Sequence, residues 1–148
     1  MGSIAEIEIH LLESIQGGMA QFYTPQSSNE TMLVQIPPGA IDKLFVHRFQ
    51  TDQLLVVRES FVLVVLHNRQ YRYVYLSETQ PQAVKIPPGV PHGAINLNSR
   101  PCLVVNAVLR HGAPHPKDYR PIEPPFPYDL ERVRTLLKGN PKIPQTMV

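Results

Sequence analysis

The sequence predicts an all-β protein, a sandwich or small barrel of short antiparallel strands that ends in one short helix. The middle of the chain is a succession of short runs rich in Val, Ile, Leu and Tyr, which are residues that favour strands. Most of these runs are bounded by Pro, Gly, Asn or Asp, which favour turns. Hydrophobic residues make up 43% of the 148 residues, which suits one domain with a core better than two.

Several segments carry this pattern and are predicted as the strands of the barrel. In chain order they are Thr31–Ile36, Lys43–Phe49, Leu54–Arg58, Phe61–His67, Tyr71–Leu76, Ala83–Ile86, Ala94–Asn98 and Cys102–Leu109. The residues from His67 to Gln70 indicate a hairpin turn. We therefore expect a single domain over residues 1–148, with its barrel core at about 31–110.

Tyr71, Tyr73 and Tyr75 alternate along one predicted strand. A strand would place their three rings on one face of the sheet. Rings in this arrangement either line a ligand cavity or pack against another part of the protein, and packing is the commoner use.

The C-terminal part, residues 111–139, lacks the strand pattern of the preceding segments and is rich in proline. Six prolines occur between Pro114 and Pro127, and they predict an extended segment that wraps the barrel without regular sheet pairing. A short helix is predicted over Leu130–Lys138, because Asp129 can cap its start and Gly139 can end it.

Charge and cysteine content narrow the functional classes. A net charge of +2 gives no basic surface of the kind that nucleic-acid binding needs. The single cysteine, Cys102, excludes an intrachain disulfide and favours a reducing compartment. No secretory signal is recognisable, and the longest apolar run, Phe61–Leu66, is too short to span a bilayer. We expect a cytoplasmic protein without membrane or nucleic-acid partners.

The stretch from Pro87 to Asn96 has the form P-x-G-x-x-H-x-x-x-N. This spacing resembles the second motif of the cupin superfamily, whose small jelly-roll barrels often hold a metal. The resemblance implies a cupin-type jelly-roll β-barrel in which His92 faces the pocket.

The first cupin motif supplies two histidines and a glutamate, and it is altered here. His47 matches the first histidine, whereas Phe49 and Gln53 stand at the other two positions. A metal-dependent oxygenase or isomerase would have to use His47, Gln53 and His92. This set lacks the carboxylate that offsets the charge of a divalent cation, so we expect no metal cofactor.

A closer resemblance is to deoxysugar-nucleotide 3,5-epimerases, over about residues 45–109. It is carried by His47-Arg48-Phe49-Gln50, by Leu54–Arg58 and by Ile86–Gly93. These are metal-free cupins that act on dTDP-4-keto sugars, usually as homodimers. The resemblance implies that His47 is the catalytic base. The other pocket positions that we expect to bind ligand are His92, Arg58, Gln53, Phe49 and Asn96.

Other family positions differ in this chain. The arginine before the base is Leu44, and the lysine after it falls near Asp52 or Gln53. The tyrosine that acts as the opposing acid falls near Val105 or Asn106, neither of which can serve as an acid. A cupin that binds a ligand without turnover therefore stays open as an alternative. We interpret His111, His115 and Asp118 as part of an exposed connector rather than a metal loop.

Overall fold

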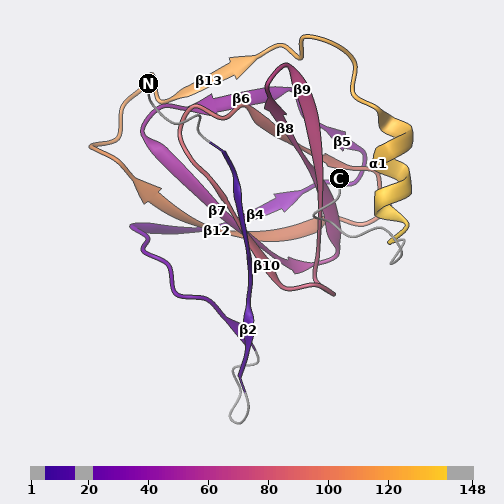
Figure 1. The fold of residues 1–148 in the computed structure, drawn as a ribbon, viewed down its shortest axis with the longest axis horizontal. Coiled ribbons are helices and arrows are strands. Elements are labelled where there is room, and N and C mark those ends of the chain that lie inside the picture. Colours follow the sequence, from indigo (N-terminus) through magenta and orange to yellow (C-terminus); the bar gives the residue numbers. More distant parts are fainter. Residues whose placement is uncertain (1–5, 16–21, 140–148) are drawn as a thin grey trace.

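The computed structural model describes residues 6–15 and 22–139, which form two facing antiparallel sheets (Figure 1). The five-stranded sheet has the order β1 (Glu8–Leu11), β10 (Gln82–Ile86), β7 (Gln50–Arg58), β12 (Cys102–Arg110) and β4 (Glu30–Ile36). The six-stranded sheet has the order β13 (Tyr119–Ile122), β6 (Leu44–His47), β11 (His92–Asn96), β8 (Ser60–His67) and β9 (Gln70–Ser77), with β5 (Ala40–Ile41) also paired to β11. In a separate two-stranded sheet, β2 (Glu13–Ser14) pairs antiparallel with β3 (Phe22–Tyr23). The prediction of an all-β fold is confirmed.

The core lies between the two sheets and is explained by the alternation of side chains along the strands. On β8, Phe61, Leu63 and Val65 pack into the space between the sheets. Val62 and Val64 point to the opposite side, where a second apolar cluster forms. Because both faces of β8 are covered, its sequence is a continuous apolar run rather than an alternating one.

Helix α1 (Leu130–Leu137) covers the outer face of the six-stranded sheet and stands at one side of the barrel in Figure 1. It begins as predicted, since the side chain of Asp129 accepts a hydrogen bond from the backbone N–H of Arg132. The tyrosine stripe of β9 packs on this face. The hydroxyl of Tyr73 accepts a hydrogen bond from the backbone N–H of Asp129 at 2.7 Å. The stripe therefore packs against other parts of the protein, and Tyr71 also lines a hollow of about 330 Å³ beside His67.

The proline-rich segment does pair with the sheet, so the prediction that it would not is wrong. Strand β13 lies within this segment and pairs with β6, placing Pro121 opposite Phe45. A proline is tolerated there because β13 is an edge strand, where one side of the backbone needs no partner. This pairing matters for the site, because it also sets Tyr119 opposite His47.

The other predicted strands are present with shifted ends. Strand β7 begins at Gln50 rather than Leu54, and β11 begins at His92 rather than Ala94. The predicted hairpin turn is confirmed: Asn68 and Arg69 have φ of 51° and 61°, as a two-residue turn with left-handed central residues requires. Among the described residues, no helix is long and apolar enough to cross a membrane.

Candidate functional site

His47 lies at the end of β6 with its side chain 13% exposed. Its Nδ1 is 2.7 Å from Oδ2 of Asp118. A carboxylate can only accept, so Nδ1 carries the proton and Nε2 presents a free lone pair when the ring is neutral. Asp118 therefore decides which nitrogen of His47 can take up a proton.

Asp118 reaches His47 because β13 is paired with β6. The backbone N–H of Phe49 donates to its Oδ1 at 2.7 Å, and the N–H of Arg48 donates to its backbone oxygen at 3.2 Å. Burial raises the pKa of Asp118, but the hydrogen bonds from Phe49 and His47 outweigh it and hold the pKa below its ordinary value. The carboxyl is thus ionised and fixed in position at neutral pH.

His92 is buried at the start of β11, and both of its ring nitrogens face acceptors. Nδ1 is 2.8 Å from the carbonyl oxygen of Val90, and Nε2 is 3.2 Å from Oδ2 of Asp52. A carbonyl and an ionised carboxylate both need a donor. The geometry therefore favours a proton on each nitrogen of His92, in contrast to His47.

Asp52 is the carboxylate that the two histidines share. Its Oδ2 lies 3.2 Å from Nε2 of His92 and 3.6 Å from Nε2 of His47. Burial raises the pKa of Asp52, but hydrogen bonds from His92, Asn106 and Gln50 overcome this and lower the pKa to about 2. Asp52 is consequently an acceptor at neutral pH and cannot itself supply a proton.

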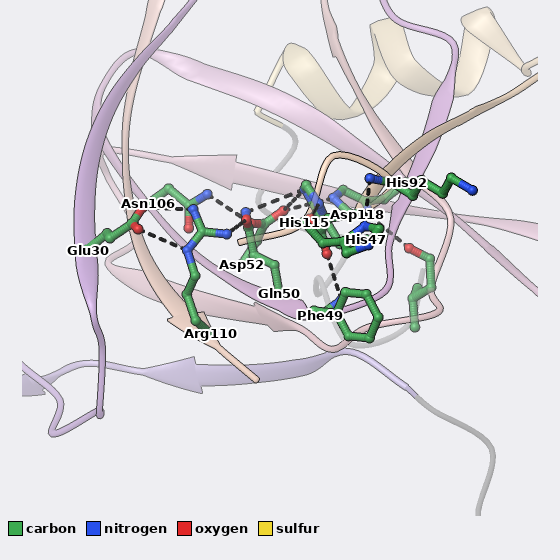
Figure 2. Close-up of polar contacts among 12 residues, drawn as sticks. Glu30, His47, Phe49, Gln50, Asp52, His92, Asn106, Arg110, His115 and Asp118 are labelled. Atoms are coloured by element: carbon green, nitrogen blue, oxygen red, sulfur yellow. Dashed lines mark hydrogen bonds and ion pairs between the residues drawn. The ribbon is translucent and has the colours of Figure 1, made fainter. Parts of the chain in front are cut away.

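A chain of hydrogen bonds connects Asp52 and His47 to the edge of the five-stranded sheet (Figure 2). Glu30 holds Arg110 through two bonds of 2.9 Å, and Arg110 donates to Oε1 of Gln50 at 3.0 Å. This contact fixes the orientation of the Gln50 amide. Its nitrogen then lies 2.6 Å from Oδ1 of Asp52 and 3.4 Å from Nε2 of His47, so Gln50 holds the two polar groups together.

Two hollows border these residues. An inner cavity of about 220 Å³ lies between the sheets, and Asp52, His92 and Asn106 supply polar groups to its wall. The other lining residues are Val34, Ile36, Asp42, Phe45, Leu54, Phe61, Leu63, Gly93, Ala94 and Val104. His47 lies on the wall of a second, open groove of about 970 Å³. His47 and His92 thus belong to one cluster, in which His92 lines the inner cavity and His47 lines the open groove.

Gln53 and Arg58 lie away from this cluster. The side-chain nitrogen of Gln53 donates to the carbonyl oxygens of Ser27 and Ala107, outside the inner cavity. Arg58 is exposed at the opposite end of β7 from Gln50, on the order of 25 Å along the strand. Neither residue lies beside His47 in this structure.

Phe49 and Asn96 have structural contacts. Phe49 lies in the bend between β6 and β7, beside the ring of His115 at 6.1 Å. Asn96 is fully buried, and its side-chain nitrogen donates to the carbonyl oxygens of Ile36 and Arg100. Both donors of the Asn96 amide are thus used to hold the backbone, and Phe49 acts on the site through its N–H.

The residues needed for a cupin metal centre are not gathered here. Phe49 offers no ligand atom, and Gln53 is turned away from His47 and His92. The two imidazole centroids lie 6.4 Å apart. Among residues 6–15 and 22–139, no group of three or more His, Cys, Asp or Glu side chains is arranged to hold a metal ion.

Sequence reasoning missed the two carboxylates of the cluster. Asp118, interpreted as part of an exposed connector, is buried and bonded to His47. The sequence places Asp52 near the position of a family lysine and gives no sign that it bonds to His92, as it does in the structure. A short bend over Arg48 and Phe49 shifts the alternation after His47, so Asp52 rather than Gln53 faces the interior.

No family model and no curated protein sequence matches the chain, whereas solved structures do. A dTDP sugar isomerase from Desulfovibrio desulfuricans is 14% identical, with a TM-score of 0.65, 96% of this chain covered and 95% of that one. A sugar 3,4-ketoisomerase from Thermoanaerobacterium thermosaccharolyticum, solved with TDP, is 13% identical, with a TM-score of 0.60 and coverages of 88% and 96%.

A third similar structure is dTDP-4-dehydrorhamnose 3,5-epimerase from Sulfolobus tokodaii. It is 19% identical, with a TM-score of 0.54, and the match covers 68% of this chain and 64% of that one. The resemblance to such epimerases, carried in the sequence by the segments around His47 and His92, is thus confirmed at the level of the fold. The chain has the cupin jelly-roll fold of these sugar-nucleotide isomerases and epimerases.

Proposed function

We propose that the protein binds a sugar nucleotide, or a similar small polar ligand, and that His47 removes a proton from a carbon next to a carbonyl group. The observation that carries this proposal is the orientation of His47. Asp118 holds its Nδ1 proton at 2.7 Å, so the lone pair of Nε2 is turned toward Gln50 and Asp52. A fixed imidazole whose second nitrogen is unprotonated is a suitable general base.

Imidazole suits this step because it is the side chain that changes charge nearest to neutral pH. After proton removal, the His47 ring would be positively charged between Asp118 and Asp52, at 2.7 Å and 3.6 Å. Two ionised carboxylates at these distances stabilise that charge. The two carboxylates therefore offset the charge that His47 gains when it accepts a proton from the ligand.

The open groove beside His47 supports an anionic ligand. Arg48, Lys117 and Arg120 line it, and its lining includes no carboxylate. Within the described part of the chain, none of the three forms an ion pair. Unpaired cations around one groove suit a diphosphate, which accepts charge-assisted hydrogen bonds. The similar structures named above act on or bind dTDP sugars or TDP.

Deuterium uptake from solvent tests the proposal. Purified protein is incubated with a dTDP-4-keto-6-deoxyhexose in deuterated water, and uptake at the carbons next to the ketone is followed by NMR. We expect wild-type protein to catalyse uptake, His47→Asn to lose it, and Asp118→Asn to slow it about 100-fold.

The matched control is His67→Asn, which changes a histidine of β8 whose ring pairs with Glu6. It should exchange at the wild-type rate. Absence of uptake with wild-type protein, or equal uptake by wild type and His47→Asn, would exclude His47 as the base.

The second candidate function is ligand binding without turnover. It is favoured by Asn106, which stands near the position where the resemblance places an acid and whose amide is committed to Gln53 and Asp52. Tight binding of TDP in a calorimeter, together with no deuterium uptake, would support this candidate against the first.

A further inference from the structure

The inner cavity and the open groove are separate compartments. Among the described residues, none lines both hollows. Phe45 lines the cavity and stacks at 5.3 Å on Tyr119, which lines the groove. His92 of the cavity and His47 of the groove are likewise adjacent, with ring centroids 6.4 Å apart. A layer of rings therefore divides the two hollows, so each can have a ligand of its own.

The wall of the cavity is mostly apolar. The five-stranded sheet supplies Leu54 and Val104 to it, and β8 of the six-stranded sheet supplies Phe61 and Leu63. Phe61, Leu63 and Val104 are each only 1% exposed, so this part of the wall lies deep in the core. Such a wall favours a ligand that gains free energy by leaving water and needs no hydrogen bond.

The buried polar residues of the wall are already bonded to other groups of the protein. The two ring nitrogens of His92 bond to a backbone carbonyl at 2.8 Å and to Asp52 at 3.2 Å. Asp52 also accepts from Gln50 at 2.6 Å and from Asn106 at 3.0 Å. The side-chain oxygen of Asn106 accepts from a backbone N–H of the same sheet at 3.0 Å. A ligand hydroxyl here would have to break one of these bonds or stay without a partner, and both are unfavourable.

The cavity has an opening and room for one ring. Val34 on β4 is 36% exposed, and Asp42 before β6 is also exposed. Both line the cavity, so a small molecule can enter between these two segments. The volume is about 220 Å³, whereas a cavity of about 150 Å³ in an engineered protein core binds benzene. A single ring with a short substituent therefore fits.

We propose that the inner cavity binds a small apolar ring compound, aromatic or alicyclic, of about six to nine carbon atoms. This inference goes beyond the proposed function, which uses the groove and His47. The ring leaves water for the apolar wall, and the bonds among His92, Asp52 and Asn106 stay intact. A sugar carries several hydroxyl groups that this wall does not satisfy, and it stays in the groove.

Toluene is the probe that tests the proposal. Protein with ¹³C-labelled methyl groups is titrated with toluene and followed by NMR. We expect saturable shifts at the methyl groups of Leu54, Leu63 and Val104, with nuclear Overhauser contacts between these methyl groups and the toluene ring. Addition of TDP should leave the toluene affinity unchanged. Shifts that do not saturate, or the absence of these contacts, would overturn the inference.

A dTDP-4-keto-6-deoxyhexose separates this inference from the proposed function. It should bind together with toluene. Displacement of toluene from the cavity methyl groups would show that the sugar enters the cavity, and it would overturn the inference while the proposed function stood. Absence of deuterium uptake, with toluene bound in the cavity, would overturn the proposed function alone.

Two variants reduce the space for the ring. Ala94→Leu adds carbons to the wall, and Val34→Phe narrows the opening. Each should weaken toluene binding about 10-fold or more, because the added carbons occupy space that the ring needs. Val34 is partly exposed, so its variant keeps the test valid where Ala94→Leu fails to fold.

Leu33→Phe is the matched control for the opening. Leu33 precedes Val34 on β4, is 71% exposed and points to the opposite face of the sheet. This variant should bind toluene as wild type does. Equal toluene affinities for Val34→Phe, Ala94→Leu and the control would overturn the inference.

Discussion

His47 and His92 are placed in different states by their partners, although they lie in one cluster. Asp118 accepts a hydrogen bond from Nδ1–H of His47, so Nε2 of the neutral ring is the unprotonated nitrogen. The two nitrogens of His92 face hydrogen-bond acceptors, the carbonyl of Val90 and the carboxylate of Asp52. The two histidines thus differ in their hydrogen-bond partners because of Asp118 and Asp52, which lie far away along the chain.

Asp52 should make the protein sensitive to acid. Its folded-state pKa of about 2 lies below the ordinary 3.8, so the ionised form stabilises the fold above about pH 4, and this stability is lost as the pH falls toward 2. The shift corresponds to about 2 kcal/mol.

Urea denaturation at several pH values checks this expectation. The free energy of unfolding should fall between about pH 4 and pH 2, and Asp52→Asn should remove much of that slope, although Asp118 will keep part of it. Glu123→Gln, at an exposed carboxyl paired with Lys43, should leave the slope unchanged. A slope unaffected by Asp52→Asn would contradict the assignment.

At the residue scale, sequence reasoning found the histidines and missed their carboxylates. His47 and His92 could be predicted because each lies in a motif with fixed local spacing. Asp118 is 71 positions from His47, and only the pairing of β13 with β6 brings them together. That pairing depends on the register of an edge strand, which no local pattern in a proline-rich segment specifies.

At the scale of elements, the strands between about residues 30 and 110 could be predicted because their apolar runs are separated by turn residues. The side that each strand turns inward was harder to predict. The bend at Arg48 and Phe49 changes the alternation, and a shift of one residue moves a side chain to the other face. For this reason Gln53 was expected in the site, where Asp52 lies.

Gly93 controls how closely two elements approach. A Cβ at this position would lie 2.8 Å from the backbone oxygen of Lys43 and 3.4 Å from that of Asp42. The turn leading into β6 therefore rests directly on β11, beside His92.

Gly93→Ala should thus destabilise the protein by about 2 kcal/mol, since the backbone must move apart. Thermal denaturation monitored by circular dichroism measures this. Displacement of β11 should also slow deuterium uptake by the variant while it remains folded. A melting temperature equal to that of wild type would show that the contact is not tight.

At the scale of the whole molecule, the net charge is small, but positive side chains gather in one place. The net charge is only +2, yet Arg48, Lys117 and Arg120 meet around the groove beside His47. The fold class could be predicted from the sequence, and the composition showed that the chain is not strongly basic. The grouping of three cations was not, because it depends on how the C-terminal segment returns to β6. The homodimer implied by the resemblance stays a prediction.

Binding of TDP should therefore depend on these cations and on salt. We expect Arg120→Gln to weaken TDP binding about 10-fold, because one charge-assisted hydrogen bond is lost. The difference between this variant and wild type should become smaller at high ionic strength, because salt screens the charges. Isothermal titration calorimetry measures both. Arg69→Gln, in the β8–β9 turn, is the control and should bind as wild type; equal affinities for Arg120→Gln and the control would place the anion elsewhere.

The two histidines should differ in which ring nitrogens carry protons, and nitrogen NMR of the ¹⁵N-labelled imidazoles measures this. We predict that, when its ring is neutral, His47 carries its proton on Nδ1 opposite Asp118, and that the two nitrogens of His92 act as hydrogen-bond donors to Val90 and Asp52. Asp118→Asn and Asp52→Asn should alter the His47 and His92 signals respectively. Two neutral rings, or a His47 that carries its proton on Nε2, would contradict the account.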